Sequence, residues 1–211
     1  MVEKMANRLA ERLVAECLIE QKQQESYAYT FQCMAEKTIT VGTILALSII
    51  LKSFVPTIFF LIFFFALRTR TGGYHADTFI KCYFGTISLY CLVVIVCKYD
   101  IGNRMSWTVL LGISTVVILV LGTLNNPAVH MNRHEMQESR RSARITLVLE
   151  ESVIAFLLVM RGEHINIKFM SAAVILCATL MCFAKILGQE EQNDEENKQT
   201  IIEVSGTGSK K

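Results

Sequence analysis

The chain has 211 residues, of which 52% are hydrophobic and 19% charged, and its formal net charge is +2 at pH 7. This composition is too apolar for a typical soluble domain, yet the charged residues require sizeable aqueous segments. It favours one all-α integral membrane domain with polar ends, and no nucleic-acid partner is expected.

Residues 1–36 are predicted to form an amphipathic N-terminal helical region. Its apolar residues fall on roughly one helical face, and its charged residues lie off that face. The apolar set is Val2, Met5, Ala6, Leu9, Leu13 and Cys17, and the charged set is Lys4, Arg8, Glu11 and Arg12. The pattern favours a helix lying on the membrane or docked on the spans, and the alternative is an ordinary solvated helix. No segment here has the apolar core of a cleavable signal peptide.

The membrane domain is predicted to span residues 37–187. Its first apolar stretch, 38–67, is interrupted only by Lys52 and Pro56, so it is either one long tilted span or a tight hairpin of two short spans. Since about 20 residues cross the hydrocarbon core, length alone does not decide. The later apolar runs are residues 79–97, 106–124, 145–160 and 169–187. The run from Ile145 is the weakest, because it is short and carries Glu150 and Glu151.

The distribution of basic residues decides between the two alternatives. A hairpin with a cytoplasmic N-terminus gives six crossings and places most lysines and arginines inside, including those of the 125–144 loop. A single span would place more of them outside. We therefore expect about six transmembrane helices, the first two forming a short hairpin, with the loop 68–82 in the cytoplasm. The polar tail 188–211 is expected to be disordered.

The loop 68–82 carries the residues that indicate chemistry. Gly72 and Gly73 are expected to end the preceding helix, and His75 and Cys82 follow. A histidine can accept the proton of a cysteine, whose thiolate is a strong nucleophile. On one helix seven residues rise about 10 Å, which is too far for proton transfer. A working pair therefore needs a loop between the two residues and a new helix starting near Phe79. Cys82 would then lie in the first turn of that helix, at the positive end of the helix dipole.

Cys82 and His75 each have an alternative interpretation without catalysis. A lone cysteine in a membrane helix is usually an apolar packing residue, and a lone histidine at a membrane edge is often solvated. Spacing alone does not decide between them.

The order Arg68, Gly72-Gly73-Tyr74-His75-Ala76 and Cys82, placed after an apolar hairpin, resembles the signature of the AgrB family (accessory gene regulator protein B). That family comprises bacterial membrane cysteine endopeptidases that mature quorum-sensing peptides. The resemblance runs from the N-terminus to the basic loop after Pro127 and does not include the tail beyond Gly188. It implies that His75 and Cys82 are the catalytic pair and that Arg68 and Gly73 are important positions.

Several residues are candidates for supporting roles. Asp77 is a candidate for orienting the His75 side chain, and the alternative is that it is a solvated helix cap. Arg68 and Arg70 are candidates for holding a substrate carboxylate or for anchoring the chain at the membrane edge. The basic run with Arg140, Arg141 and Arg144 suits an acidic precursor tail, or it simply marks the cytoplasmic side.

Two polar features lie outside this loop. His130 and His134 are one helical turn apart, but without the zinc-site pattern they are interpreted as solvated, and no metal or cofactor is expected. Glu150 is predicted to pair with Lys185 or Arg144, which would neutralise a costly carboxylate in a span, and Glu151 to face another partner or the headgroups.

The chain has seven cysteines. Reduced thiols are expected, because the spacings indicate neither a metal site nor a disulfide framework. Four of the cysteines lie in apolar runs and are interpreted as packing residues, namely Cys91, Cys97, Cys177 and Cys182.

Together these features predict a multi-pass peptidase of the bacterial cell membrane. Its expected partners are the lipid bilayer, a small amphipathic pro-peptide like that of the accessory gene regulator system (AgrD-like), and a second copy of the chain as a candidate. A small transporter and a non-enzymatic membrane scaffold are the alternatives, but neither gives a role to His75 and Cys82.

Overall fold

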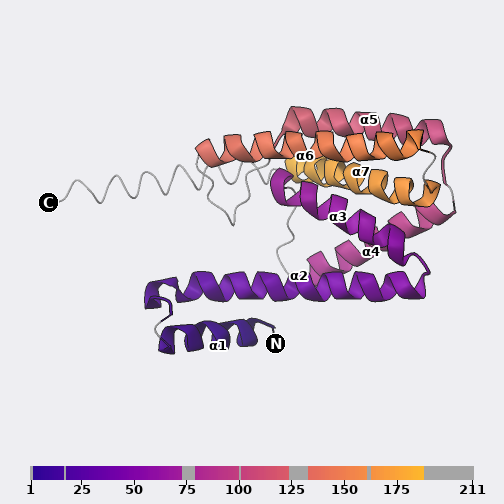
Figure 1. Cartoon of the computed structure of the whole chain (residues 1–211). Coiled ribbons are helices and arrows are strands. Elements are labelled where there is room, and N and C mark those ends of the chain that lie inside the picture. Colours follow the sequence, from indigo (N-terminus) through magenta and orange to yellow (C-terminus); the bar gives the residue numbers. More distant parts are fainter. Residues whose placement is uncertain are drawn as a thin grey trace. The chain divides into compact units, whose positions relative to one another are not determined.

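In the computed structural model, the described residues are 2–16, 18–72, 79–99, 101–123, 133–160 and 163–187. Within these ranges the regular secondary structure is entirely helical, with seven α-helices and one 3₁₀ helix (Figure 1), which confirms the predicted all-α class. Their bounds are α1 Val2–Ala15, η1 Gln21–Gln23, α2 Gln24–Ile50, α3 Phe54–Thr71, α4 Phe79–Lys98, α5 Arg104–Leu121, α6 Arg133–Val159 and α7 His164–Ile186.

Four helical segments among the described residues are long and apolar enough to cross a membrane, which is the pattern of a multi-pass membrane protein. These segments are Gln21–Ile50, Phe54–Thr71, Ile80–Lys98 and His164–Ile186. Met105–Leu121 is apolar but shorter. The number of six crossings therefore stays a prediction.

The apolar stretch 38–67 is broken as the hairpin interpretation requires. Helix α2 ends at Ile50 and α3 begins at Phe54, with Lys52 in the left-handed region at φ 50°. Pro56 lies in the first turn of α3, where a missing backbone N–H costs little. Helix α2 has 27 residues and begins at Gln24, well before the apolar stretch, so the length of the part that crosses the membrane stays a prediction. Hydropathy marks only the apolar part of a helix that polar residues extend.

The chain forms two units, of which the first comprises residues 1–52 and 76–91. In this unit α1 packs along α2 and buries Ala6 and Ala10, whose small side chains allow a close approach (Figure 1). Met5 and Leu9, which lie on the predicted apolar face, are exposed. The N-terminal helix is thus present, and its place at a membrane interface stays a prediction.

The second unit comprises residues 53–75 and 92–211, and α7 is its central helix. α3, α5 and α6 all contact α7 (Figure 1). The side chains of Phe169, Ala173 and Val174 are fully buried on α7. Small residues at such contacts let apolar helices approach closely in a membrane.

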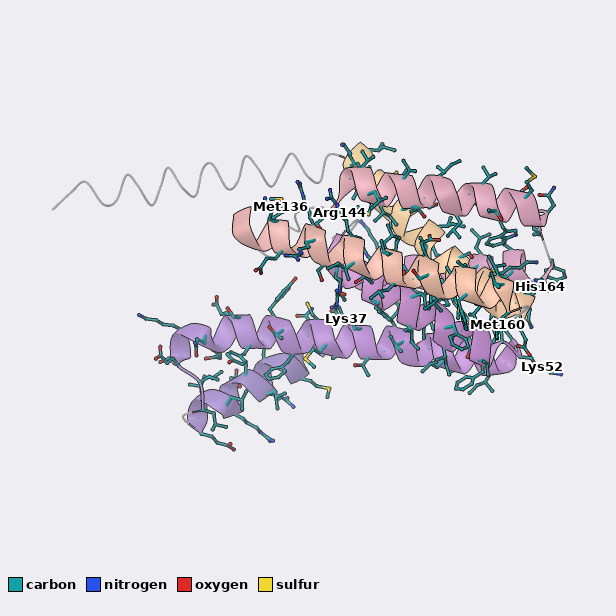
Figure 2. All side chains as sticks on the ribbon, turned by 45° about the horizontal axis from the view of Figure 1, so that its top comes forward. Lys37, Lys52, Met136, Arg144, Met160 and His164 are labelled. Atoms are coloured by element: carbon teal, nitrogen blue, oxygen red, sulfur yellow. The ribbon has the colours of Figure 1, made fainter. Side chains whose placement is uncertain are left out.

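In the second unit α3, α5 and α7 run in one direction and α6 runs in the other (Figure 1). Figure 2 shows Met136 and Arg144 toward one end of α6, and Met160 with His164 at the opposite end, where α7 begins. The ends of α3, α5 and α7 and the start of α6 therefore lie on the same side of this unit.

Helix α6 starts much earlier than the sequence indicated. Residues 125–144 were predicted to be a loop, but 133–144 belong to α6. Glu, Gln, Met, Ala and Arg, which are frequent there, favour a helix without making it apolar. Arg140, Arg141 and Arg144 consequently lie on a helix and not on a loop.

Candidate functional site

Cys82 lies in the first turn of α4, as the sequence predicted. The helix begins at Phe79. Among the cysteines that the structure describes, Cys82 is the exposed one, and its thiol is free. Thr86 Oγ1 donates to the Cys82 carbonyl at 2.8 Å, and this bond leaves the thiol itself unengaged.

The residue after Cys82 fixes this turn within the first unit. The Tyr83 hydroxyl and Thr43 Oγ1 on α2 are 3.0 Å apart and form a hydrogen bond. Tyr83 also makes an edge contact with Phe84, with ring centroids 5.5 Å apart. The helix turn that carries the thiol is therefore attached to α2 by a side chain next to the thiol.

The other members of the predicted loop site are Gly73, His75 and Asp77. All three lie outside the described residues. The catalytic pairing of His75 with Cys82 and the orienting role of Asp77 therefore stay predictions.

Arg68 and Arg70 lie in the last turn of α3, and both side chains bind the protein itself. Arg68 Nη1 donates to the Gly72 carbonyl. Arg70 Nη1 donates to Ser142 Oγ on α6 and, at 3.5 Å, to the Ser142 carbonyl. These contacts support a site-supporting role more than direct binding of a substrate carboxylate.

The backbone of Arg70 is held as firmly as its side chain. Its carbonyl oxygen accepts hydrogen bonds from Thr123 Oγ1 at 3.1 Å and from Ser139 Oγ at 2.9 Å. Thr123 follows the end of α5, and Ser139 lies on α6. Sequence reasoning missed Thr123, Ser139 and Ser142, because a hydroxyl beside a basic run has no pattern that indicates a distant partner.

The structure brings the predicted arginines together at one end of the second unit. Arg70 contacts Ser142 between Arg141 and Arg144, which are both exposed. The stem of Arg140 lies against Gly122, where an added Cβ would come within 3.3 Å of Arg140 Cγ. This basic end comprises Arg68, Arg70, Arg140, Arg141 and Arg144, and we use that name for it below.

The acidic pair of α6 lies deeper in the second unit. Thr115 Oγ1 on α5 donates to Glu151 Oε1 at 2.7 Å, so Glu151 has a partner other than Glu150. Glu150 is only 6% exposed, and neither of its carboxyl oxygens has a hydrogen-bond partner among the described residues. An unpartnered carboxyl in a membrane-embedded bundle is costly and usually has a function.

The predicted pairing of Glu150 is wrong. Lys185 is exposed. Glu150 precedes the end of α6 at Val159 by nine residues, and Lys185 follows the start of α7 at His164 by 21. In an antiparallel pair this difference separates the two residues by about 18 Å along the axis. Arg144, six residues earlier on α6, does not bind Glu150 either.

The packing role predicted for two other cysteines is confirmed. Cys97 and Cys177 are buried, and Cys177 Sγ lies 3.7 Å from the Phe64 carbonyl. Within the described ranges no three His, Cys, Asp or Glu side chains come together as a metal site. His130 and the side chain of His134 lie outside those ranges.

Comparison with known families covers nearly the whole chain. Residues 3–187 match the family described as accessory gene regulator B. No curated protein and no solved structure matches the chain. The matched range includes Cys82, the 73–78 segment and the basic end, and it stops where the polar tail begins.

Proposed function

We propose that this chain, which belongs to the accessory gene regulator B family, is a membrane cysteine endopeptidase that cleaves and cyclises a small precursor peptide. The family implies a role in processing quorum-sensing peptides. The observation that carries the proposal is the exposed, free thiol of Cys82 in the first turn of a membrane helix. It lies seven residues after the histidine of the Gly-Gly-Tyr-His-Ala run, and the resemblance to the family implies that these two residues are a nucleophile and its base.

In the first step the Cys82 sulfur attacks the scissile carbonyl carbon of the precursor. His75 accepts the thiol proton and then gives it to the leaving amine, so that the C–N bond breaks and a C–S bond forms. The products are a thioester that joins the retained half of the precursor to Cys82, and a released downstream fragment.

In the second step a cysteine thiol or serine hydroxyl of the retained half attacks the thioester carbon. Cys82 leaves as the thiol, and the peptide becomes a cyclic thiolactone or lactone. A thiolactone conserves the bond type of the thioester, so this step runs near equilibrium if water is kept out. A site against a membrane wall excludes water better than one in open solvent.

The basic end supports binding of an acidic precursor tail. Arg141 and Arg144 are exposed, whereas Arg68 and Arg70 are engaged with Gly72 and Ser142. The exposed pair is therefore the better candidate for contacting substrate carboxylates. Arg68 and Arg70 are the better candidates for supporting the end of α3, from which the chain continues to His75.

The helix directions of the second unit support a cytoplasmic site. α3, α5 and α7 end on the side where α6 begins, as alternating crossings require. That side carries the basic end and Lys185, whereas Arg104 and Lys168 lie near the starts of their helices on the opposite side. Positive residues favour the cytoplasmic side, where a precursor peptide is made.

A transporter is the second candidate, and one observation favours it. Glu150 is buried in α6 without a hydrogen-bond partner among the described residues, and ionisable groups in spans often mark a transport pathway. A transport function would give no role to Cys82 and would not account for the family match. Uptake or export that persists in a Cys82→Ala variant would favour it.

The test of the proposed function uses purified protein in liposomes with a short candidate precursor that has an amphipathic segment, an internal Cys or Ser and an acidic tail. We expect thiol-dependent cleavage and a cyclic product, detected by mass spectrometry. The Cys82→Ala variant should be inactive, and Cys91→Ala on the same helix is the matched control. Equal cleavage by the Cys82→Ala variant would contradict the peptidase.

A further inference from the structure

The last turn of α3 is capped by side chains from other parts of the second unit. The final carbonyls of a helix have no intrahelical partner, and in most proteins water or the following residues satisfy them. Here the Arg70 carbonyl accepts two hydroxyl hydrogen bonds, from Thr123 and Ser139. Because these residues lie 53 and 69 positions away in the sequence, the cap joins three elements.

The chain beyond Arg70 is held in the same way. Thr71 is buried, and its hydroxyl donates to the Leu67 carbonyl at 3.1 Å. The Gly72 N–H donates to the Arg68 carbonyl at 3.1 Å, and the Arg68 guanidinium binds the Gly72 carbonyl. With φ at 67°, Gly72 turns the chain out of the helix in a conformation that a side chain would strain. The direction in which the chain leaves α3 is thus fixed.

We propose that Thr123 and Ser139 are positioning residues for the peptidase reaction. By holding the Arg70 carbonyl they fix the point from which the chain enters residues 73–78, and His75 lies three residues beyond Gly72. This inference rests on the proposed function, in which His75 is the base. A base displaced by about 1 Å from its productive position can cost about 100-fold in rate.

A purely structural role would have a different signature. The core between α3 and α7 is built from apolar side chains such as Phe60, Leu67 and Ala173, and it does not depend on either hydroxyl. Arg70 is exposed and Ser139 is half-buried, so water can replace the lost Ser139 donor at the Arg70 carbonyl. Loss of the cap should therefore change the rate of the chemical step more than folding or substrate binding.

The test measures kcat and KM for precursor cleavage by full-length protein in liposomes. Thr123→Val and Ser139→Ala each remove one donor, and we expect kcat to fall about 10-fold for each and about 100-fold for the double variant. KM should stay within about 2-fold, because neither residue belongs to the arginines proposed to bind the precursor. Ser139→Thr keeps the hydroxyl and should restore most of the rate.

Two matched controls remove hydroxyls whose hydrogen bonds, within the described part of the chain, go to carbonyls of their own helix. Thr69→Val lies next to Arg70, where the Thr69 hydroxyl donates to the Phe65 and Ala66 carbonyls at 2.9 and 3.4 Å. Ser152→Ala lies on α6, where the Ser152 hydroxyl donates to the Val148 carbonyl at 2.6 Å. Both controls should keep kcat within about 2-fold of the unmodified protein.

A second measurement does not depend on peptidase activity. Hydrogen exchange at the Gly72 amide should be faster in the Thr123→Val, Ser139→Ala double variant than in either control. An unchanged kcat in the double variant, while cleavage still requires Cys82, would overturn the positioning role alone. A fall in kcat that only follows a lower folded fraction would overturn it as well. Cleavage that does not require Cys82 would instead overturn the proposed function.

Discussion

The turn that carries Cys82 and the end of α3 that leads to His75 are held in opposite ways. The Cys82 thiol is free and exposed, and the attachment to α2 is made by its neighbour Tyr83. At Arg70 both the backbone and the side chain bind other helices. A nucleophile must be reachable by the substrate, whereas a base works only from a defined position. The chain thus leaves the thiol of the proposed nucleophile accessible and fixes the end of the helix that leads to the proposed base.

The largest expected effect comes from removing the nucleophile. Cys82→Ala should abolish precursor cleavage, because no other described thiol is exposed at a helix start. Membrane insertion should be unchanged, since Cys82 is exposed and the substitution alters no span. Cleavage assays in liposomes, with membrane accumulation measured in parallel, check both expectations. An active Cys82→Ala variant would show that the exposed thiol has no catalytic role.

His75→Ala should be about as inactive as Cys82→Ala. A base and its nucleophile act as one unit, so their losses do not add, and the double variant should be no slower than either single variant. Single-turnover kinetics of the three variants provide the measurement. If the single variants kept substantial activity and the losses added, His75 would be a structural residue. The firm hold on the end of α3 would then have no link to a catalytic base.

The exposed part of the basic end should affect binding more than chemistry. Replacing Arg141 and Arg144 together by Gln should raise KM several-fold and leave kcat nearly unchanged, because exposed charges contribute about 0.2–1 kcal/mol each. The effect should shrink in high salt, which screens such charges. Lys185→Gln, an exposed charge on α7, is the control. A fall in kcat with constant KM would place the two arginines with the positioning residues instead.

Local signals in the sequence were sufficient for part of this arrangement. The start of α4 near Phe79 could be predicted, because glycines and helix caps act over a few residues. The break of the 38–67 stretch was instead predicted from the distribution of basic residues along the whole chain. The bonds of Arg70 to Thr123 and Ser139 could not, since they join positions far apart in the chain. The start of α6 was missed because hydropathy does not report a polar helical extension of a span.

The smallest effect is expected at Glu150. Its carboxyl is buried without a hydrogen-bond partner among the described residues, and Lys185 is about 18 Å away along the helix axes. Glu150→Gln replaces an ionisable group that is costly to bury and keeps the side-chain shape, so the folded protein should accumulate in the membrane at the original level or above it. Lys185→Gln should be neutral, and exchanging the two charges should restore nothing. Quantifying folded protein in membranes for the three variants tests these expectations. Rescue by the charge exchange would show that Glu150 and Lys185 do pair. Normal accumulation of all three variants together with lost peptide processing would assign Glu150 to the active site.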